Sequence, residues 1–124
     1  MRTPRRSEHL EQKALIELCA WHAKSDPRYQ LIFAIPNGGH RHVAVASKLK
    51  AEGVRKGVPD LMLPVANPPY HGLFIEMKVK PNKPSAEQLI WIKQLTEQGY
   101  KAVVCYSWQD ALATIKSYLD RTAE

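Results

Sequence analysis

The chain has 124 residues, of which 44% are apolar, so it is long enough for one hydrophobic core and too short for two. It contains no run of 18 apolar residues and no apolar segment after its basic start, which excludes a spanning helix and a secretory signal. The net charge is +6, and residues 1–62 carry 11 cations against 6 acids. This uneven charge favours a polyanionic partner such as nucleic acid.

The first half of the chain predicts a helix, a strand and a second helix. The first helix starts after the N-cap residue Ser7 and ends before residues 25–27, Ser-Asp-Pro. The branched run 31–35, followed by a Pro-Asn-Gly-Gly turn, predicts a strand. Residues 41–52 predict a helix that Gly53 closes. The expected apolar stripe of the first helix comprises Leu10, Ala14, Leu15, Leu18, Trp21 and His22.

The second half predicts strands at 60–65, 72–79 and 102–106, with a helix after Ser85 and another after Ser107. The expected inward residues of these two helices are Leu89, Ile92 and Leu95, then Ala111, Leu112, Ile115 and Leu119. The predicted order α-β-α-β-β-α-β-α is that of an α/β sandwich around a small mixed sheet. We expect residues 1–7 to form a flexible basic arm and residues 8–124 a single domain.

The residues with the clearest chemistry lie on the two central strands. Pro59-Asp60 begins one strand, and Glu76 and Lys78 leave the same face of the next because they are two positions apart. If these strands pair as a hairpin, Asp60 comes near Glu76. Two adjacent carboxylates repel each other unless a cation such as Mg²⁺ lies between them. The pattern therefore predicts a divalent-metal site with a lysine beside it.

Each of these residues also has an ordinary structural interpretation. Pro-Asp is common at turns, so Asp60 by itself indicates little. Glu76 and Lys78 could form the solvated face of an edge strand, although Glu76 has apolar neighbours on both sides. The buried-acid interpretation is favoured because the two halves of the pattern occur together.

The pattern Pro59-Asp60 … Glu76-x-Lys78 resembles the PD-(D/E)xK nuclease superfamily, whose fold is restriction-endonuclease-like. The longer contexts 53–61, GVRKGVPDL, and 75–78, IEMK, are similar to the VRR-NUC family within it. The resemblance spans residues 8 to 119 and has further elements. These are Glu11, the run 35–39 (IPNGG), Ser85, Gln88 and Gly99-Tyr100.

The resemblance implies a divalent-metal phosphodiesterase that acts on DNA. Asp60 and Glu76 would be carboxylate ligands of Mg²⁺ or Mn²⁺, and the backbone carbonyl of Met77 a further ligand. Glu11 would reach the metal from the first helix, directly or through water. Glu8 lies one turn earlier on a similar face, so the choice between the two stays open.

Two further side chains have catalytic roles by this resemblance. Lys78 would be the base or the transition-state stabiliser, and Gln88 would contact a water of the site or the DNA backbone. Stand-alone members of the family are small, pair as homodimers and act on branched DNA such as four-way junctions. We therefore expect a DNA endonuclease that hydrolyses the phosphodiester by in-line attack of water, with no membrane partner.

A basic stretch adjoins the acidic motif and predicts contacts to the DNA backbone. The expected nucleic-acid-binding residues are Arg41, Lys48, Lys50, Arg55 and Lys56. A merely solvated helix face is the alternative for this stretch. The histidines, including His40 and His42, lack zinc-ligand spacing, and the tryptophans are expected in the core or a dimer interface.

Two other classes of function remain open. A non-catalytic nucleic-acid-binding module could retain the nuclease fold, and a small regulatory or scaffold protein could use its charge for solubility alone. The two cysteines, Cys19 and Cys105, lie far apart in apolar segments, which favours a reducing, cytoplasmic setting. A bacterial or phage-encoded protein is expected.

Overall fold

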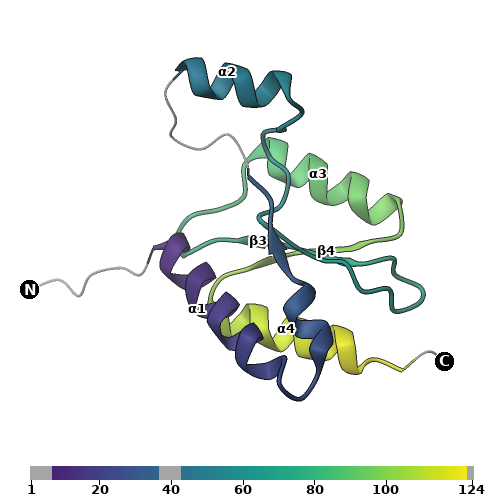
Figure 1. Cartoon of the computed structure of the whole chain (residues 1–124). Helices are drawn as coiled ribbons and strands as arrows, with labels where there is room; N and C mark the ends of the chain where they lie inside the picture. The colour runs from purple at the N-terminus through teal and green to yellow at the C-terminus, as the bar shows by residue number, and fades with distance from the viewer. Residues whose placement is uncertain (1–6, 37–42, 123–124) are drawn as a thin grey trace, which may run out of the picture.

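A computed structural model describes residues 7–36 and 43–122 (Figure 1). The four helices are α1 (Glu8–His22), α2 (Val43–Ala51), α3 (Ala86–Glu97) and α4 (Trp108–Asp120). The four strands are β1 (Phe33–Ala34), β2 (Leu61–Leu63), β3 (Leu73–Met77) and β4 (Lys101–Cys105), and a 3₁₀ helix covers Pro27–Leu31. This order confirms the predicted α-β-α-β-β-α-β-α arrangement. Residues 1–6 of the predicted arm 1–7 and the Asn37–Gly39 part of the predicted turn lie outside the described residues, and Ser7 is the N-cap of α1.

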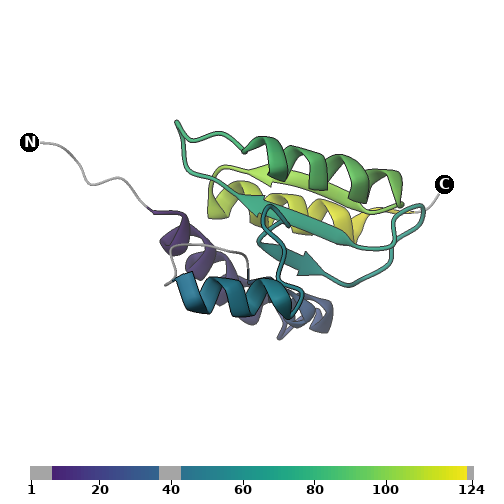
Figure 2. The same cartoon turned by 90° about the horizontal axis from the view of Figure 1, so that it is seen from above.

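The strands form one mixed sheet in the order β1-β2-β3-β4. The β1–β2 and β2–β3 pairs are antiparallel, whereas β3 and β4 run parallel and are connected through α3. The hairpin that the sequence suggested is thus present, with Leu61 opposite Ile75 and Leu63 opposite Leu73. Figures 1 and 2 show α1 and α4 together on one side of the sheet and α3 on the other.

The hydrophobic core lies between the sheet and the α1–α4 pair. Alternation along β3 sends Leu73, Ile75 and Met77 into this core, each at most 1% exposed. The opposite face of β3 carries Phe74 and Glu76 on the side of the sheet that α3 covers. All five residues of β3 are buried, as expected for a strand covered on both faces.

Helix α1 begins where the sequence predicts, with the Ser7 hydroxyl accepting a hydrogen bond from the Leu10 amide at 3.1 Å. Its buried stripe differs from the predicted one. Leu10 is 45% exposed and Trp21 is 61% exposed, whereas the buried positions are Glu11, Leu15 and Cys19. These three residues follow each other at four-residue spacing. Compared with the prediction, α1 is rotated about its axis, so that the Glu11 carboxylate lies on the buried face together with apolar side chains. The spacing of apolar residues alone does not reveal this orientation.

The segment after α1 also differs from the prediction. Residue 31, expected to start a strand, ends a 3₁₀ helix, and β1 is only two residues long. The physical reason is local, because the Asp26 carboxylate accepts a hydrogen bond from the Arg28 amide at 3.1 Å and Pro27 occupies the first turn.

Helix α3 starts with the predicted cap at Ser85 but buries none of its residues. Leu89, expected to face inward, is 53% exposed, and its neighbour Ile90 is 54% exposed. Ile92 and Leu95 are half-buried. The helix thus covers the sheet with the side that carries Gln88, Ile92 and Leu95 rather than with Leu89. Polar contacts to the sheet account for part of its orientation, as described below.

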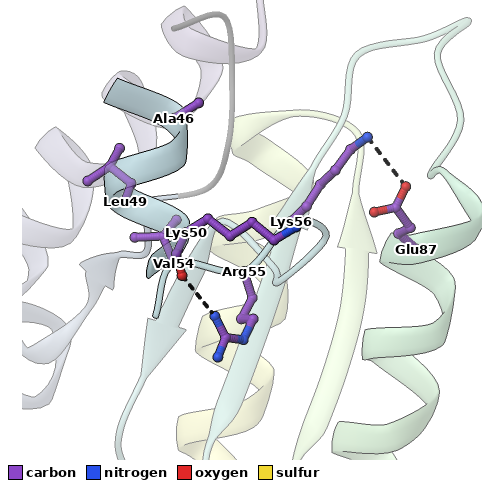
Figure 3. A pocket seen from close by; sticks show the side chains of 7 residues that line it. All are labelled: Ala46, Leu49, Lys50, Val54, Arg55, Lys56 and Glu87. Carbon is purple, nitrogen blue, oxygen red and sulfur yellow. Dashed lines mark hydrogen bonds and ion pairs between the residues drawn. The ribbon is translucent and has the colours of Figure 1, made fainter. Parts of the chain in front are cut away.

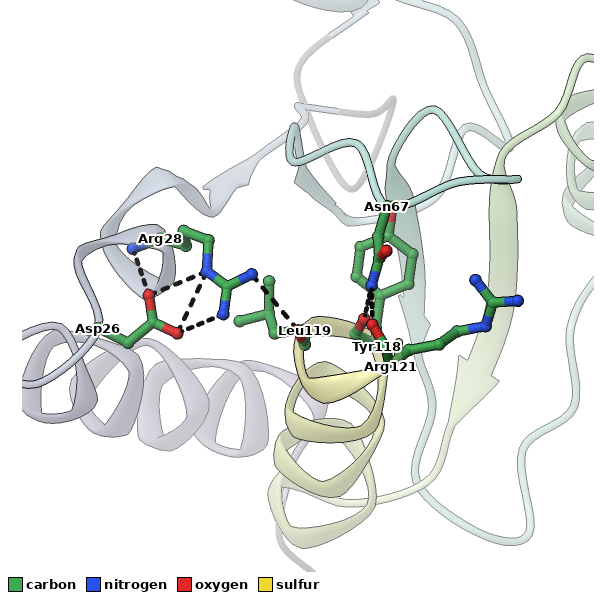
Figure 4. Close-up of polar contacts among 6 residues, drawn as sticks. All are labelled: Asp26, Arg28, Asn67, Tyr118, Leu119 and Arg121. Atoms are coloured by element: carbon green, nitrogen blue, oxygen red, sulfur yellow. Dashed lines mark hydrogen bonds and ion pairs between the residues drawn. The ribbon is translucent and has the colours of Figure 1, made fainter. Parts of the chain in front are cut away.

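Helix α4 is fastened at its C-terminal end by two side chains from distant parts of the chain (Figure 4). Arg28 donates to the carbonyl of Leu119 at 3.3 Å, and Asp26 holds the same guanidinium at 2.8 Å. The Asn67 amide donates to the carbonyls of Tyr118 and Arg121 at 2.8 and 2.9 Å. Carbonyls at a helix C-terminus have no partner within the helix, so these bonds satisfy groups that would otherwise be exposed or unpaired.

Among the described residues, no helix has the length and apolar content that crossing a membrane requires. Cys19 and Cys105 are both buried and free, and burial raises the pKa of each thiol to about 11.

Candidate active site

The hairpin brings the two predicted carboxylates together at the end of β2 and β3. Leu61 pairs with Ile75, so the antiparallel register continues to place Asp60 opposite Glu76. The Oδ2 atom of Asp60 accepts a hydrogen bond from the Met77 amide at 2.8 Å, which anchors the carboxylate to β3. Two residues that lie 16 positions apart in the sequence therefore share one site because of strand pairing.

Glu76 is the most deeply buried charged side chain among the described residues, at 1% exposed. Its Oε2 accepts from the Gln88 side-chain amide at 3.0 Å, whereas its Oε1 has no hydrogen-bond partner. Burial and then the neighbouring Asp60 carboxylate raise the pKa of Glu76 to about 8, which Lys78 partly opposes. A buried carboxylate oxygen without a donor is costly unless a proton or a cation compensates it.

Lys78 follows β3 and its Nζ lies 3.9 Å from Glu76 Oε2. Its side chain is 13% exposed, and its backbone amide donates to the carbonyl of Cys105 in β4 at 2.9 Å. The structure therefore places the ammonium group beside the acidic pair, as the spacing of Glu76 and Lys78 predicts. The same backbone bond fixes the point at which the chain leaves the sheet.

Gln88 connects the site to the start of α3. The Ser85 hydroxyl accepts from the Gln88 amide at 3.2 Å, and Gln88 Oε1 accepts from the Ser85 amide at 2.8 Å. This reciprocal capping box leaves the Nε2 group of Gln88 to donate to Glu76. One side chain thus both starts the helix and holds the buried glutamate.

The two acids of α1 occupy different surroundings. Glu11 is 5% exposed, and its Oε1 accepts from the Trp108 amide at the first residue of α4, at 3.1 Å. Glu8 is more exposed, accepts from the Asn82 side chain at 3.4 Å, and its charge contributes to the raised pKa of Glu76. Among the described residues, no three His, Cys, Asp or Glu side chains are grouped closely enough to hold a metal ion. The ligand role predicted for Glu11 stays a prediction, and the structure gives that side chain a contact at α4.

Of the basic residues predicted to bind DNA, those that the structure describes lie on α2 and on the loop that follows it, and Figure 3 draws Lys50, Arg55 and Lys56. Lys48 and Lys50 are exposed in the last turn of α2, where Arg55 donates to the Lys50 carbonyl at 3.3 Å. Lys56 forms an ion pair of 3.4 Å with Glu87 in the first turn of α3. Arg41, with His40 and His42, lies outside the described residues. These basic side chains therefore run from the last turn of α2 to the start of α3, next to the helix turn that holds Gln88.

Comparison with known proteins identifies the family. The family model of the VRR-NUC domain matches residues 2–109. The chain belongs to the VRR-NUC family. A solved structure entitled "VRR_NUC domain protein" is 27% identical in sequence, with a TM-score of 0.78 over 94% of this chain and 91% of the other. No protein of curated function matches the chain. The VRR-NUC domain implies a nuclease-type function, and the four helices and mixed sheet are consistent with an α/β nuclease-like fold.

The donors of this VRR-NUC site fit a divalent cation of the Mg²⁺ type. The site offers two adjacent carboxylates, of which Glu76 has a buried oxygen with no hydrogen-bond donor. Mg²⁺ is usually held by one or two carboxylates, with its other positions filled by waters and phosphate oxygens. Asp60 and Glu76 suit that number of ligands, and a cation would compensate the charge that burial disfavours.

Some contacts around the site were not predicted from the sequence. Glu87, in the first turn of α3, pairs with Lys56. The Trp91 indole donates to the Lys56 carbonyl at 3.1 Å. Gly57 has a φ of +93°, and a Cβ there would lie 3.0 Å from the backbone of Glu87. The glycine before the Pro-Asp pair was the available signal, because it permits both this backbone conformation and close approach.

Proposed function

We propose that this VRR-NUC chain is a divalent-metal-dependent DNA endonuclease that hydrolyses phosphodiester bonds and prefers branched DNA such as four-way junctions. The observation that carries the proposal is the pairing of Asp60 with the buried Glu76, which has an oxygen without a hydrogen-bond partner and an ammonium group 3.9 Å away. A purely structural acid would be expected to have its buried oxygens satisfied, as in other buried polar groups.

The residues of the site have separable roles in this proposal. Asp60, Glu76 and the Met77 carbonyl would hold Mg²⁺ or Mn²⁺, which supplies Lewis-acid polarisation of a phosphate oxygen and activation of water when bound. Gln88 fixes one oxygen of Glu76 and so orients the other. Lys78 stabilises negative charge that develops on the phosphate oxygens. The cations of α2 and of residues 55–56 hold the DNA backbone against the acids.

The proposal is tested by incubating the protein with labelled four-way-junction, splayed and linear DNA in Mg²⁺, Mn²⁺ or EDTA. We expect metal-dependent cutting that is fastest on the junction and absent in EDTA. DNA binding without cutting in either metal would instead support a non-catalytic binding module. No binding at low salt would support the regulatory or scaffold alternative.

Lys78 allows a matched test of the chemistry. We expect Lys78→Ala to abolish cutting while leaving DNA affinity nearly unchanged, because this ammonium group faces Glu76 rather than the exposed basic surface. Lys93→Ala, an exposed lysine on α3, is the control and should cut as the parent does. Cutting by Lys78→Ala at the parent rate would contradict the mechanism.

We also propose that the working form is a homodimer, which would present two active sites to the two strands of a junction. Exposed apolar side chains support an interface, since Leu89 and Ile90 of α3 are each more than half exposed. Light scattering should give twice the mass of the 14.1 kDa chain. The two buried free thiols support a reducing, cytoplasmic setting in a bacterial or phage-infected cell.

A further inference from the structure

A pocket of about 400 Å³ lies between α2 and the first turn of α3, apart from the acidic pair (Figure 3). Its apolar lining consists of Ala46 and Leu49 from α2 and Val54 from the following loop. Its charged lining consists of Lys50, Arg55, Lys56 and Glu87. The volume falls within the range of about 300–1,000 Å³ that is usual for small-ligand pockets.

The chemistry of the lining suits a flat, partly apolar group that carries an anion beside it. Three cations face one carboxylate, so the rim attracts negative charge. The apolar residues offer nothing to a phosphate, and Glu87 would repel one placed against it. A nucleic-acid base would pack against the apolar residues of the lining, while its own or a neighbouring phosphate would lie at the cations.

The cations are held in ways that leave them available to a phosphate. Arg55 is positioned by its bond to the Lys50 carbonyl at the end of α2. Lys56 and Glu87 form an ion pair whose side chains are 75% and 51% exposed, and such pairs contribute little and exchange readily. The Trp91 indole fixes the backbone of Lys56 rather than its side chain.

Residues of the pocket are close in the chain to residues of the acidic pair. Glu87 lines the pocket and the next residue, Gln88, holds Glu76. Lys56 precedes Asp60 by four residues, which span at most about 14 Å of chain. Gly57 packs directly against the Glu87 backbone, so the loop cannot move far from α3 without opening this contact. A DNA strand whose scissile phosphate lies at the proposed metal site therefore has a nearby nucleotide within reach of the pocket.

We propose that this pocket accepts one unpaired base of the DNA substrate, next to the phosphate that is cut at the proposed metal site. The inference rests on the proposed function and deepens it, because it names unpaired nucleotides near the cut as the feature recognised. Enzymes that modify a nucleobase stack the extruded base between aromatic or apolar side chains, and extrusion costs least where pairing is already lost.

The test measures binding in EDTA, so it does not depend on cutting. The probes are two labelled DNA duplexes with a single-nucleotide bulge, one with a normal bulged base and one with an abasic residue that keeps the phosphate. We expect the parent protein to bind the base-bearing bulge about five- to tenfold more tightly. Equal affinity for both probes would overturn the proposal.

The variant Ala46→Phe fills the pocket and should raise the Kd for the base-bearing bulge to that of the abasic one, without weakening abasic binding. Ala51→Phe adds the same group at an exposed position of α2 outside the lining and should keep the parent's preference. Equal weakening of both probes by Ala46→Phe would overturn the proposal. If Ala46→Phe does not fold, Ala46→Leu, which suits a helix, replaces it with the same expectations.

A base analogue gives a second readout. With 2-aminopurine as the bulged base, we expect its fluorescence to change on binding to the parent and Ala51→Phe proteins and to change much less with Ala46→Phe. An identical change with all three proteins would overturn the proposal. If the protein retains the base preference but cuts no DNA in Mg²⁺ or Mn²⁺, the proposed function fails and the base pocket stands.

Discussion

Glu76 and Glu11 are the two buried charged side chains among the described residues, and their surroundings differ in a way that separates two uses of a buried acid. Glu11 lies on α1 and accepts a backbone N–H at the first residue of α4, at 3.1 Å. A helix N-terminus carries partial positive charge and unpaired amides, so it stabilises the carboxylate. Glu11 thus connects α1 to α4 on the core side of the sheet.

Glu76 lies on the other side of the sheet and has the opposite kind of neighbour. Its nearest charged partner across the strands is another carboxylate, and its Oε1 has no hydrogen bond. Lys78 is present but 3.9 Å away. The charged form of Glu76 is therefore unfavourable in the metal-free protein. The comparison shows that the two acids do not differ in being buried but in whether neighbouring groups compensate the buried charge.

The largest expected effect concerns Asp60. Removing one charge of the acidic pair with Asp60→Asn should reduce cutting of a four-way junction by at least about 10³-fold, because the site loses a cation ligand. Single-turnover rates in Mg²⁺ measure the effect. Asp120→Asn, which neutralises an exposed acid at the end of α4, is the matched control and should cut normally. If Asp60→Asn cuts at the parent rate, the Asp60–Glu76 pair does not serve cutting, and Glu76 then has no role that Glu11 lacks.

The second effect is on stability and concerns Glu11. We expect Glu11→Ala to lower the free energy of unfolding by about 2 kcal/mol, because a charge-assisted bond to the α4 terminus is lost inside the protein. Urea unfolding followed by circular dichroism measures it, with the exposed Glu17→Ala as the control. If Glu11→Ala keeps full stability but loses cutting, Glu11 acts at the metal and the contrast drawn above is wrong.

The third effect is a pH dependence of stability that belongs to Glu76. Its pKa in the folded chain is about 8, against an ordinary value of 4.5. Because the pKa of Glu76 is higher in the folded chain than in the unfolded chain, protonation of this carboxyl stabilises the folded state. That stabilisation is complete below pH 4.5 and is lost as the pH rises through 8. In EDTA at pH 8.5, Glu76→Gln should therefore be more stable than the parent by at least about 1.4 kcal/mol, the equivalent of one pKa unit.

Urea unfolding of both proteins between pH 4.5 and 8.5 tests this expectation. The difference should grow steadily with pH, and Mg²⁺ should raise the stability of the parent more than that of Glu76→Gln. Parallel stability curves for the two proteins would show that Glu76 is compensated in the folded chain.

The smallest effect concerns the exposed cations, where each contact is weak. The pair of changes Arg55→Ala and Lys56→Ala should weaken DNA binding by about fivefold at low salt and reduce the slope of log Kd against log salt. Lys93→Ala and Lys116→Ala together remove the same charge elsewhere and should have a smaller effect. Equal losses from both pairs would mean that the α2 region holds DNA no better than the rest of the surface.

Much of the site could be predicted because it depends on short-range rules. The two-residue spacing of Glu76 and Lys78 places both on one face of a strand. The short connection between the β2 and β3 segments made a hairpin the simplest way to bring Asp60 near Glu76, and the register confirms that pairing. Caps at Ser7, Ser85 and Ser107 were equally local and are all present.

The incorrect predictions concern which side of a helix faces the core. Leu10, Trp21 and Leu89 are apolar and correctly spaced, yet all three are largely exposed. Helix α1 turns instead toward the α4 terminus through Glu11, and α3 toward the sheet through Gln88. Hydrogen bonds to groups elsewhere in the chain favour these orientations, and the spacing of apolar residues does not indicate such long-range contacts.

The sequence by itself therefore determined the order of the elements, the close pair of carboxylates and the lysine beside it, because neighbouring residues and strand alternation set them. Only the tertiary structure decided which acids are compensated and where the pocket forms. In the sequence, Glu76 has apolar neighbours on both sides and Glu11 lies between Leu10 and Gln12, and neither pattern shows what the carboxylate contacts. What distinguishes them is that Glu11 meets a helix N-terminus 97 positions away, and Glu76 meets another carboxylate.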